Sequence, residues 1–131
     1  MTELPFFVYG TLRPGEYNHD RFLLGRTATE EPARLSGALL YDGPGYPYAM
    51  PGEGRIAGDL VTAAPGAYGE LLAELDRVEL PAGYERAART VVRLRDGAAV
   101  RAWVWFAAPG TPHGPLIEGG DWRARGGPRT P

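Results

Sequence analysis

The sequence predicts an α+β domain or a partly closed barrel, and three observations lead to that class. Most apolar segments are short and rich in β-branched and aromatic residues, which is typical of strands. Only residues 67–80 place their leucines at convincing helical spacing. An Asp-Gly pair separates two strand-like segments at residues 86–107, which indicates a hairpin. Several strands with one helix favour this class over an alternating α/β fold.

The N-terminal half contains three strand-like segments. Residues 6–9 form an apolar run bounded by proline and glycine, which predicts a buried strand. Residues 21–24 favour a short helix. Residues 35–41 and 55–62 predict the second and third strands. Between them, residues 46–51 are aromatic and rich in proline, which favours a stiff loop that walls a pocket.

The C-terminal half predicts a helix and a hairpin. The helix is expected over residues 67–80, ending at a Pro-Ala-Gly stretch. Residues 86–94 and 99–107 predict two strands joined by a tight primed turn at Asp96-Gly97. The second of these strands is apolar on both faces, as in a closed barrel or at an oligomer interface. We expect one domain over residues 1–122 and a flexible tail over residues 123–131.

The composition excludes several classes of function. The 131 residues carry a net charge of −2 without a polybasic run, so no nucleic-acid partner is expected. The chain contains no lysine and no cysteine, which excludes Schiff-base, P-loop lysine, disulfide and thiolate chemistry. The N-terminal segment fits neither a signal peptide nor a membrane span, so the expected location is the cytoplasm. His19 and His113 are isolated in loops without ligand spacing, so both are expected at the surface and no metal is expected.

Glu79 stands out on the predicted helix. With a step of about 100° per residue, Glu79 falls about 80° from Leu71, inside the arc occupied by the apolar side chains. Burial would raise the pKa of this carboxyl toward neutrality, which suits a group that accepts and returns a proton. Two other interpretations stay open, namely exposure at a frayed helix end and a structural ion pair with Arg86.

A glycine-bearing turn follows the first strand. Gly10 has no Cβ, so a ligand can approach the backbone closely, and successive N–H groups after a strand can bind an anion. The same pattern also fits an ordinary turn, so the residues by themselves leave both interpretations open.

Taken together, these features resemble a known family. The matching stretches follow one another in order from about residue 6 to residue 122: Phe7-Val8-Tyr9-Gly10-Thr11-Leu12-Arg13, Gly45-Tyr46-Pro47, Ile56-Ala57-Gly58-Asp59-Leu60, Leu75-Asp76-Arg77-Val78-Glu79, Tyr84-Glu85-Arg86 and Gly120-Asp121-Trp122. They resemble the signature of the γ-glutamylcyclotransferase-like family, which includes γ-glutamylamine cyclotransferases and the cyclotransferase of butirosin biosynthesis. The sequence departs from the family pattern in having Thr11 where many members have serine, and Leu80 where glycine is common.

The resemblance implies a small mixed-strand barrel with flanking helices. It also implies an enzyme that cyclises a γ-glutamyl amine, or a γ-glutamyl-acylated metabolite, to 5-oxoproline by intramolecular aminolysis. Glu79 would be the general acid/base, and the substrate would contact the Tyr9-Gly10-Thr11-Leu12 loop together with Tyr84 and Arg86. Arg86 either binds the substrate carboxylate or pairs with Glu79, which would lower the pKa of the glutamate. The reaction requires no cofactor.

The partner expected from this resemblance is a small γ-glutamyl compound, and the sequence does not specify its leaving amine or the oligomeric state. Residues 46–50 and 111–117 are expected to shape the part of the pocket that holds the amine. Two alternatives remain, a non-catalytic small-molecule-binding module of the same fold and hydrolysis of an amide in the same pocket.

Overall fold

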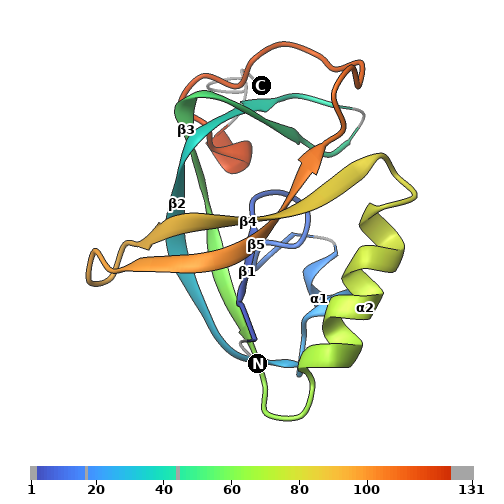
Figure 1. The fold of residues 1–131 in the computed structure, drawn as a ribbon, viewed down its shortest axis with the longest axis vertical. Helices are drawn as coiled ribbons and strands as arrows, with labels where there is room; N and C mark the ends of the chain where they lie inside the picture. Colours follow the sequence, from blue (N-terminus) through green and yellow to red (C-terminus); the bar gives the residue numbers. More distant parts are fainter. Residues whose placement is uncertain (1–2, 17, 44, 125–131) are drawn as a thin grey trace.

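The computed structural model describes residues 3–16, 18–43 and 45–124, and its strands close into a small mixed barrel flanked by helices. The expected fold class is confirmed. The strand order around the barrel is β1-β3-β2-β4-β5 (Figure 1), with β1 and β5 in parallel contact and the other neighbours antiparallel. The strands are β1 (Phe6–Val8), β2 (Thr27–Tyr41), β3 (Tyr48–Ala63), β4 (Tyr84–Arg93) and β5 (Ala99–Ala107).

The β2–β3 pair is much longer than the sequence pattern predicts. Residues 48–51, expected in a loop, begin β3 and pair with the end of β2. The register shifts between Ser36 and Ala38, so the long pair contains an irregularity of the β-bulge type. A Cβ on Gly54 would lie 2.4 Å from the Leu39 Cδ2 atom, so glycine is needed where the strands pack closely. Prolines and glycines that resemble loop signals thus lie within strands.

The β4–β5 hairpin is confirmed, but its turn differs from the predicted one. A primed two-residue turn requires positive φ at both central residues. Gly97 has a φ of 71°, whereas no described residue other than glycine has a positive φ, so Asp96 does not fit that turn. Hydrogen bonds from Gly97 N–H to Arg93 O and from Arg93 N–H to Ala98 O instead enclose a wider loop. The Asp96 carboxylate also accepts hydrogen bonds from the Arg93 side chain and the Ala98 N–H.

The described ranges contain three helical elements, and two of them lie outside the barrel. The short α1 (His19–Phe22) and the longer α2 (Tyr68–Glu79) lie on the same side, where Figure 1 shows α2 beside β4 and β5. The predicted helix 67–80 therefore agrees with α2 to within a residue at each end. The 3-10 helix η1 (Trp122–Ala124) includes the first residues of the expected tail, and residues 125–131 lie outside the described residues.

Side-chain alternation on the strands divides the buried residues into two clusters. One fills the barrel and includes Phe7, Leu35 and Val104. The other lies on the outer surface of the barrel under α1 and α2, and it includes Val8 and Trp105. Neighbouring residues of β1 and of β5 therefore contribute to different clusters, because successive strand side chains point to opposite faces. This arrangement explains why β5 is apolar on both faces.

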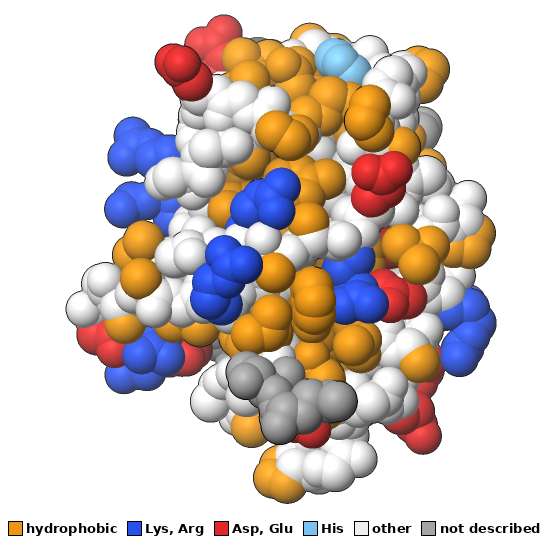
Figure 2. Space-filling model, viewed as in Figure 1, with side chains coloured by type: hydrophobic (Ala, Val, Ile, Leu, Met, Phe, Trp, Pro, Cys, Tyr) orange, Lys and Arg blue, Asp and Glu red, His pale blue; other side chains and the backbone are white. Residues whose placement is uncertain are grey.

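The surface carries charges of both signs. On the face drawn in Figure 2, arginine side chains stand among acidic and hydrophobic ones. None of the helices in the described ranges has both the length and the hydropathy needed to cross a bilayer.

Candidate active site

A cavity of about 230 Å³ lies on the outer side of the barrel, beside the end of α2. Its walls come from β1 and the loop that follows, the segment before β3, the end of α2, and the adjoining parts of β4 and β5. The lining residues are Phe7, Val8, Tyr9, Gly10, Thr11, Leu12, Asn18, Tyr46, Pro47, Val78, Glu79, Ala82, Tyr84 and Trp105. The first strand, the loop after it and Glu79 therefore meet in one concave site, which is where small-molecule ligands are usually held.

Glu79 is the only acidic side chain among the described lining residues, and none of those residues is basic. Its carboxyl has no hydrogen-bond or ion-pair partner within the described part of the chain. Burial raises the pKa of Glu79 from 4.5 to about 7, because water no longer stabilises the charged form fully. A carboxyl with this pKa is present in both protonation states near neutral pH, as a general acid/base requires.

Arg86 lies outside the lining of the cavity and does not pair with Glu79. Its Nε donates to Asp76 Oδ1 at 3.0 Å, and its guanidinium lies 4.2 Å from the centre of the Trp103 ring. The same Asp76 oxygen accepts a 2.9 Å hydrogen bond from Trp105 Nε1. Among the site residues expected from the sequence, Arg86 is thus the one that the structure separates from the others.

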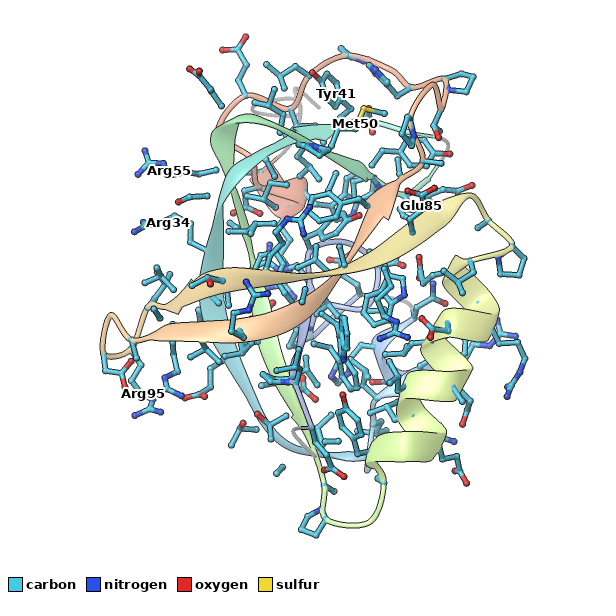
Figure 3. The ribbon with its side chains drawn as sticks, in the orientation of Figure 1. Arg34, Tyr41, Met50, Arg55, Glu85 and Arg95 are labelled. Atoms are coloured by element: carbon cyan, nitrogen blue, oxygen red, sulfur yellow. The ribbon has the colours of Figure 1, made fainter. Side chains whose placement is uncertain are left out.

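Other arginines project away from the cavity. In Figure 3, Arg34 and Arg55 point outward from β2 and β3, and Arg95 lies at the tip of the β4–β5 hairpin. All three lie on the side of the barrel opposite α2 in this view. An anionic ligand in the cavity would therefore depend on hydrogen-bond donors of the lining rather than on these cations.

The loop after β1 supplies such donors. Its turn is closed by a hydrogen bond from Arg13 N–H to Gly10 O. Within the described ranges, the backbone N–H groups of Gly10, Thr11 and Leu12 donate to no protein acceptor. A Cβ on Gly10 would lie 2.7 Å from the Pro47 Cδ atom, so only glycine allows the loop to pack against this wall of the cavity.

Tyr9 and Tyr84 form much of the remaining wall, and both hydroxyl groups are occupied. Tyr9 donates to the Trp105 carbonyl, and Tyr84 donates to the Pro47 carbonyl at 2.6 Å. Burial is the main cause that raises the pKa of each phenol, and the charge of Glu79 raises both further. Both rings therefore stay protonated at neutral pH.

Three side-chain hydrogen bonds that support the loop were not expected from the sequence. The buried Arg13 donates to Asp59 on β3 at 2.7 Å and to Asp121 at 2.9 Å, which anchors the loop to the barrel and to the segment before η1. Asn18 Nδ2 donates to Thr11 Oγ1 at 2.9 Å. Arg13, Asp59 and Asp121 each lie in a stretch that resembles the family signature, so that signature was the available signal. Asn18 carried no such signal.

Two further expectations about the site differ from the structure. Residues 111–117 lie outside the lining of the cavity, and residues 112–114 instead border a separate shallow hollow. His19, expected at the surface, belongs to α1 and is mostly buried, with its Nε2 2.6 Å from Glu30 Oε1. No group of three or more His, Asp or Glu side chains in the described ranges is arranged to hold a metal ion.

Known proteins share this fold and sequence pattern. A protein of Methanocaldococcus jannaschii that is provisionally named a γ-glutamylcyclotransferase is 27% identical over 89% of this chain and 93% of its own length. The γ-L-glutamyl-butirosin B γ-glutamyl cyclotransferase of Niallia circulans is 34% identical over 56% of this chain, and the match spans only 44% of that protein. The crystal structure of an AIG2-like protein from Mus musculus superposes with a TM-score of 0.66 at 27% identity, covering 83% of this chain and 80% of that one.

The family model described as γ-glutamyl cyclotransferase, AIG2-like, matches residues 6–124, which include every residue that lines the cavity. The match therefore spans both the barrel and the cavity beside it. This chain belongs to the AIG2-like γ-glutamyl cyclotransferase family.

Proposed function

We propose that the chain is an enzyme that cyclises a γ-glutamyl amide to 5-oxoproline and releases the free amine. The observation that carries this proposal is the Glu79 carboxyl, which has no partner among the described residues and has a pKa of about 7. It lies in the same cavity as the loop after β1. A carboxyl that is costly to bury and lacks a partner is a strong candidate for proton transfer.

Glu79 serves two steps of this reaction. Its carboxylate takes a proton from the α-ammonium of the γ-glutamyl group, and the freed amine attacks the side-chain carbonyl carbon to form a five-membered ring. The resulting carboxylic acid then gives its proton to the departing nitrogen as the original amide C–N bond breaks. The new ring nitrogen loses its extra proton to the released amine or to solvent, which leaves the neutral lactam. The Glu79 carboxylate is thus regenerated at the end of each cycle, and the reaction consumes no external oxidant, reductant or nucleophile. Acid–base assistance of this kind contributes about 10²–10⁴-fold to a rate.

The loop after β1 holds the substrate in the conformation that cyclises. The N–H groups of Gly10, Thr11 and Leu12, which have no acceptor in the described part of the chain, donate to the α-carboxylate. No cation stands among the described lining residues to bind it instead. Fixing the carboxylate keeps the α-amine close to the carbonyl that it attacks, which is the entropic part of the catalysis. The rings of Tyr9 and Tyr84 enclose the aliphatic chain of the γ-glutamyl group.

The relatives support a γ-glutamyl amine as the substrate. The name of the Niallia circulans protein states that it is a γ-glutamyl cyclotransferase of γ-L-glutamyl-butirosin B. The cavity of this chain suits the same half of the substrate, because its donors and its one acid match a carboxylate and an α-ammonium. Arg86 has no role in this proposal, since it is engaged with Asp76 outside the cavity.

A product assay tests the proposal directly. The purified full chain is incubated with a panel of γ-glutamyl amines, and both 5-oxoproline and glutamate are measured by mass spectrometry. We expect 5-oxoproline and free amine in equal amounts from the wild type, and almost none from the Glu79→Gln variant. Release of glutamate instead would indicate hydrolysis. Release of neither compound would favour a non-catalytic binding module.

A further inference from the structure

Two hydrogen bonds join Thr11 and Asn18 on the wall of the cavity. The Asn18 backbone N–H donates to Thr11 O at 3.0 Å, and the Asn18 side-chain Nδ2 donates to Thr11 Oγ1 at 2.9 Å. Both residues line the cavity. The side-chain bond is therefore a second link between the same two residues, in addition to the backbone bond.

The Asn18 side chain serves the cavity wall and not the helix that follows it. Asn18 precedes α1 with helical backbone angles, φ −90° and ψ −8°, and its side chain makes no capping hydrogen bond. An asparagine that caps a helix normally has an extended backbone instead. The Asn18 amide is therefore committed to the Thr11 hydroxyl, and both residues line the cavity.

The bond determines where the Thr11 hydroxyl proton points. A hydroxyl oxygen has one proton to donate and two lone pairs that accept. Because Nδ2 of Asn18 carries only donors, Thr11 Oγ1 is the acceptor in this contact, and its own proton must point elsewhere. Within the described ranges no protein acceptor takes that proton, so it is available to an acceptor inside the cavity.

We propose that Asn18 is a positioning residue that fixes the Thr11 hydroxyl as a hydrogen-bond donor to the α-carboxylate of the ligand. This inference rests on the proposed function for the identity of that carboxylate. The Thr11 hydroxyl adds a side-chain donor to the backbone N–H groups of the same loop, and it compensates for the lack of a cation among the described lining residues. Asn18 does not touch the carboxylate and acts through Thr11.

Binding of 5-oxoproline, followed by NMR titration of the labelled full chain, tests this role without requiring turnover. We expect the dissociation constant to rise about tenfold in Thr11→Val and in Asn18→Ala, the effect of losing one hydrogen bond to a charged group. Thr11→Ser should bind as the wild type does. The control Thr62→Val removes an exposed hydroxyl on β3, away from the cavity lining, and should leave binding unchanged.

The double variant Thr11→Val/Asn18→Ala distinguishes positioning from an independent contact. If Asn18 acts through Thr11, the double variant binds no worse than Thr11→Val alone. Asn18→Asp should weaken binding more than Asn18→Ala, because a carboxylate accepts the Thr11 proton and repels the ligand. The Asn18 side chain does not cap α1, and the backbone bond from Asn18 N–H to Thr11 O remains in this variant, so its fold should persist in a thermal melt.

Three results would overturn the inference: wild-type binding by both Asn18 variants, multiplicative losses in the double variant, or no binding of 5-oxoproline by the wild type. These outcomes are separable from failure of the proposed function. A chain that binds 5-oxoproline through Thr11 and Asn18 but releases none from any γ-glutamyl amine contradicts the activity and supports the inference. A chain that releases 5-oxoproline normally in the Asn18→Ala and Asn18→Asp variants, with unchanged KM, contradicts the inference and supports the activity.

Discussion

Asp76 and Glu79 lie one turn apart on α2, yet the structure gives them opposite surroundings. Asp76 accepts hydrogen bonds from Arg86 and from the indole of Trp105, so its charge is matched by donors. Glu79 faces the cavity without any partner in the described ranges, and burial raises its pKa to about 7. The same helix therefore carries one acid that ties α2 to the barrel and one acid that is free to exchange a proton.

Depth of burial does not separate these two kinds of acid. Asp59 is 5% exposed and belongs to the most deeply buried polar groups, but Arg13 donates to it at 2.7 Å. Glu79 is more exposed than Asp59. What distinguishes Glu79 is the absence of a compensating donor, because an unpaired buried carboxylate is unstable relative to its neutral form. The pairing of an acid, rather than its burial, thus points to its role.

The largest expected effect is on kcat, and it separates Glu79 from Asp76 when each acid is replaced by its amide. Glu79→Gln should lower kcat about 10²–10⁴-fold, because the amide cannot accept and return a proton. Asp76→Asn should leave kcat within about twofold, since an amide oxygen still accepts hydrogen bonds from Arg86 or Trp105. Steady-state 5-oxoproline release measures both. Equal losses in the two variants would remove the proposed distinction between them.

The next effect is on stability. The pKa of Glu79 rises from 4.5 to about 7 on folding, so the unfolded chain loses this proton first as the pH increases. The free energy of unfolding therefore falls by about 3 kcal/mol between pH 4.5 and pH 7 from this group alone, and the loss persists at higher pH. Below pH 4.5 the group is protonated in both states and contributes no loss.

Glu79→Gln isolates this contribution. The variant should match the wild type near pH 4 and exceed it in stability at pH 8 by about 3 kcal/mol, as measured by urea unfolding at each pH. Asp76→Asn should show no such gain, because the Asp76 charge is compensated by Arg86. A constant difference between Glu79→Gln and the wild type across this range would mean that Glu79 ionises in the native state as it does in the unfolded one.

These contrasts show which parts of the molecule the sequence predicts. The leucine spacing predicts α2, and the same angular argument places Glu79 toward the barrel, where it is found. The length of β2 and β3 was underestimated because Pro51 and Gly54 resemble loop residues, whereas cross-strand packing and a bulge accommodate them. Local patterns miss such features because they depend on a partner strand distant in the sequence.

For the same reason, the sequence predicts some residues of the candidate site and not others. The loop at Tyr9-Gly10-Thr11-Leu12 was expected only through the family resemblance, since an isolated strand and glycine also fit an ordinary turn. The position of Arg86 two residues after Tyr84 suggests a shared site, but neighbours separated by two residues on a strand need not contact the same ligand. Asn18 was not expected at all, because its role depends on a contact with Thr11 that only the folded loop creates.

A smaller effect, on the pH dependence of the activity, is expected when Glu79 is given an arginine partner of the kind that Asp76 has in Arg86. Ala82 lines the cavity, and its N–H donates to the Glu79 carbonyl. In Ala82→Arg, a guanidinium near the carboxyl should lower the pKa of Glu79 by about one unit. In the plot of kcat/KM against pH, the acidic inflection is expected near pH 7 for the wild type. In this variant it should move to lower pH by about the same amount as the pKa. Ala82→Met fills similar space without charge and should keep the inflection in place.

The smallest expected effect is that of Arg86→Met. Arg86 contacts Asp76 and Trp103 rather than the cavity, so 5-oxoproline release should stay within about twofold of the wild type. Loss of the half-buried ion pair and of the contact with the indole should cost about 1 kcal/mol of unfolding free energy. A large rise in KM would place Arg86 on the substrate carboxylate, and a shift of the pH inflection would place it on Glu79. Unchanged kinetics with a lower melting temperature assigns Arg86 to the structural pair with Asp76. Of these two acids, the one without a partner in the described ranges is then also the one without a structural task.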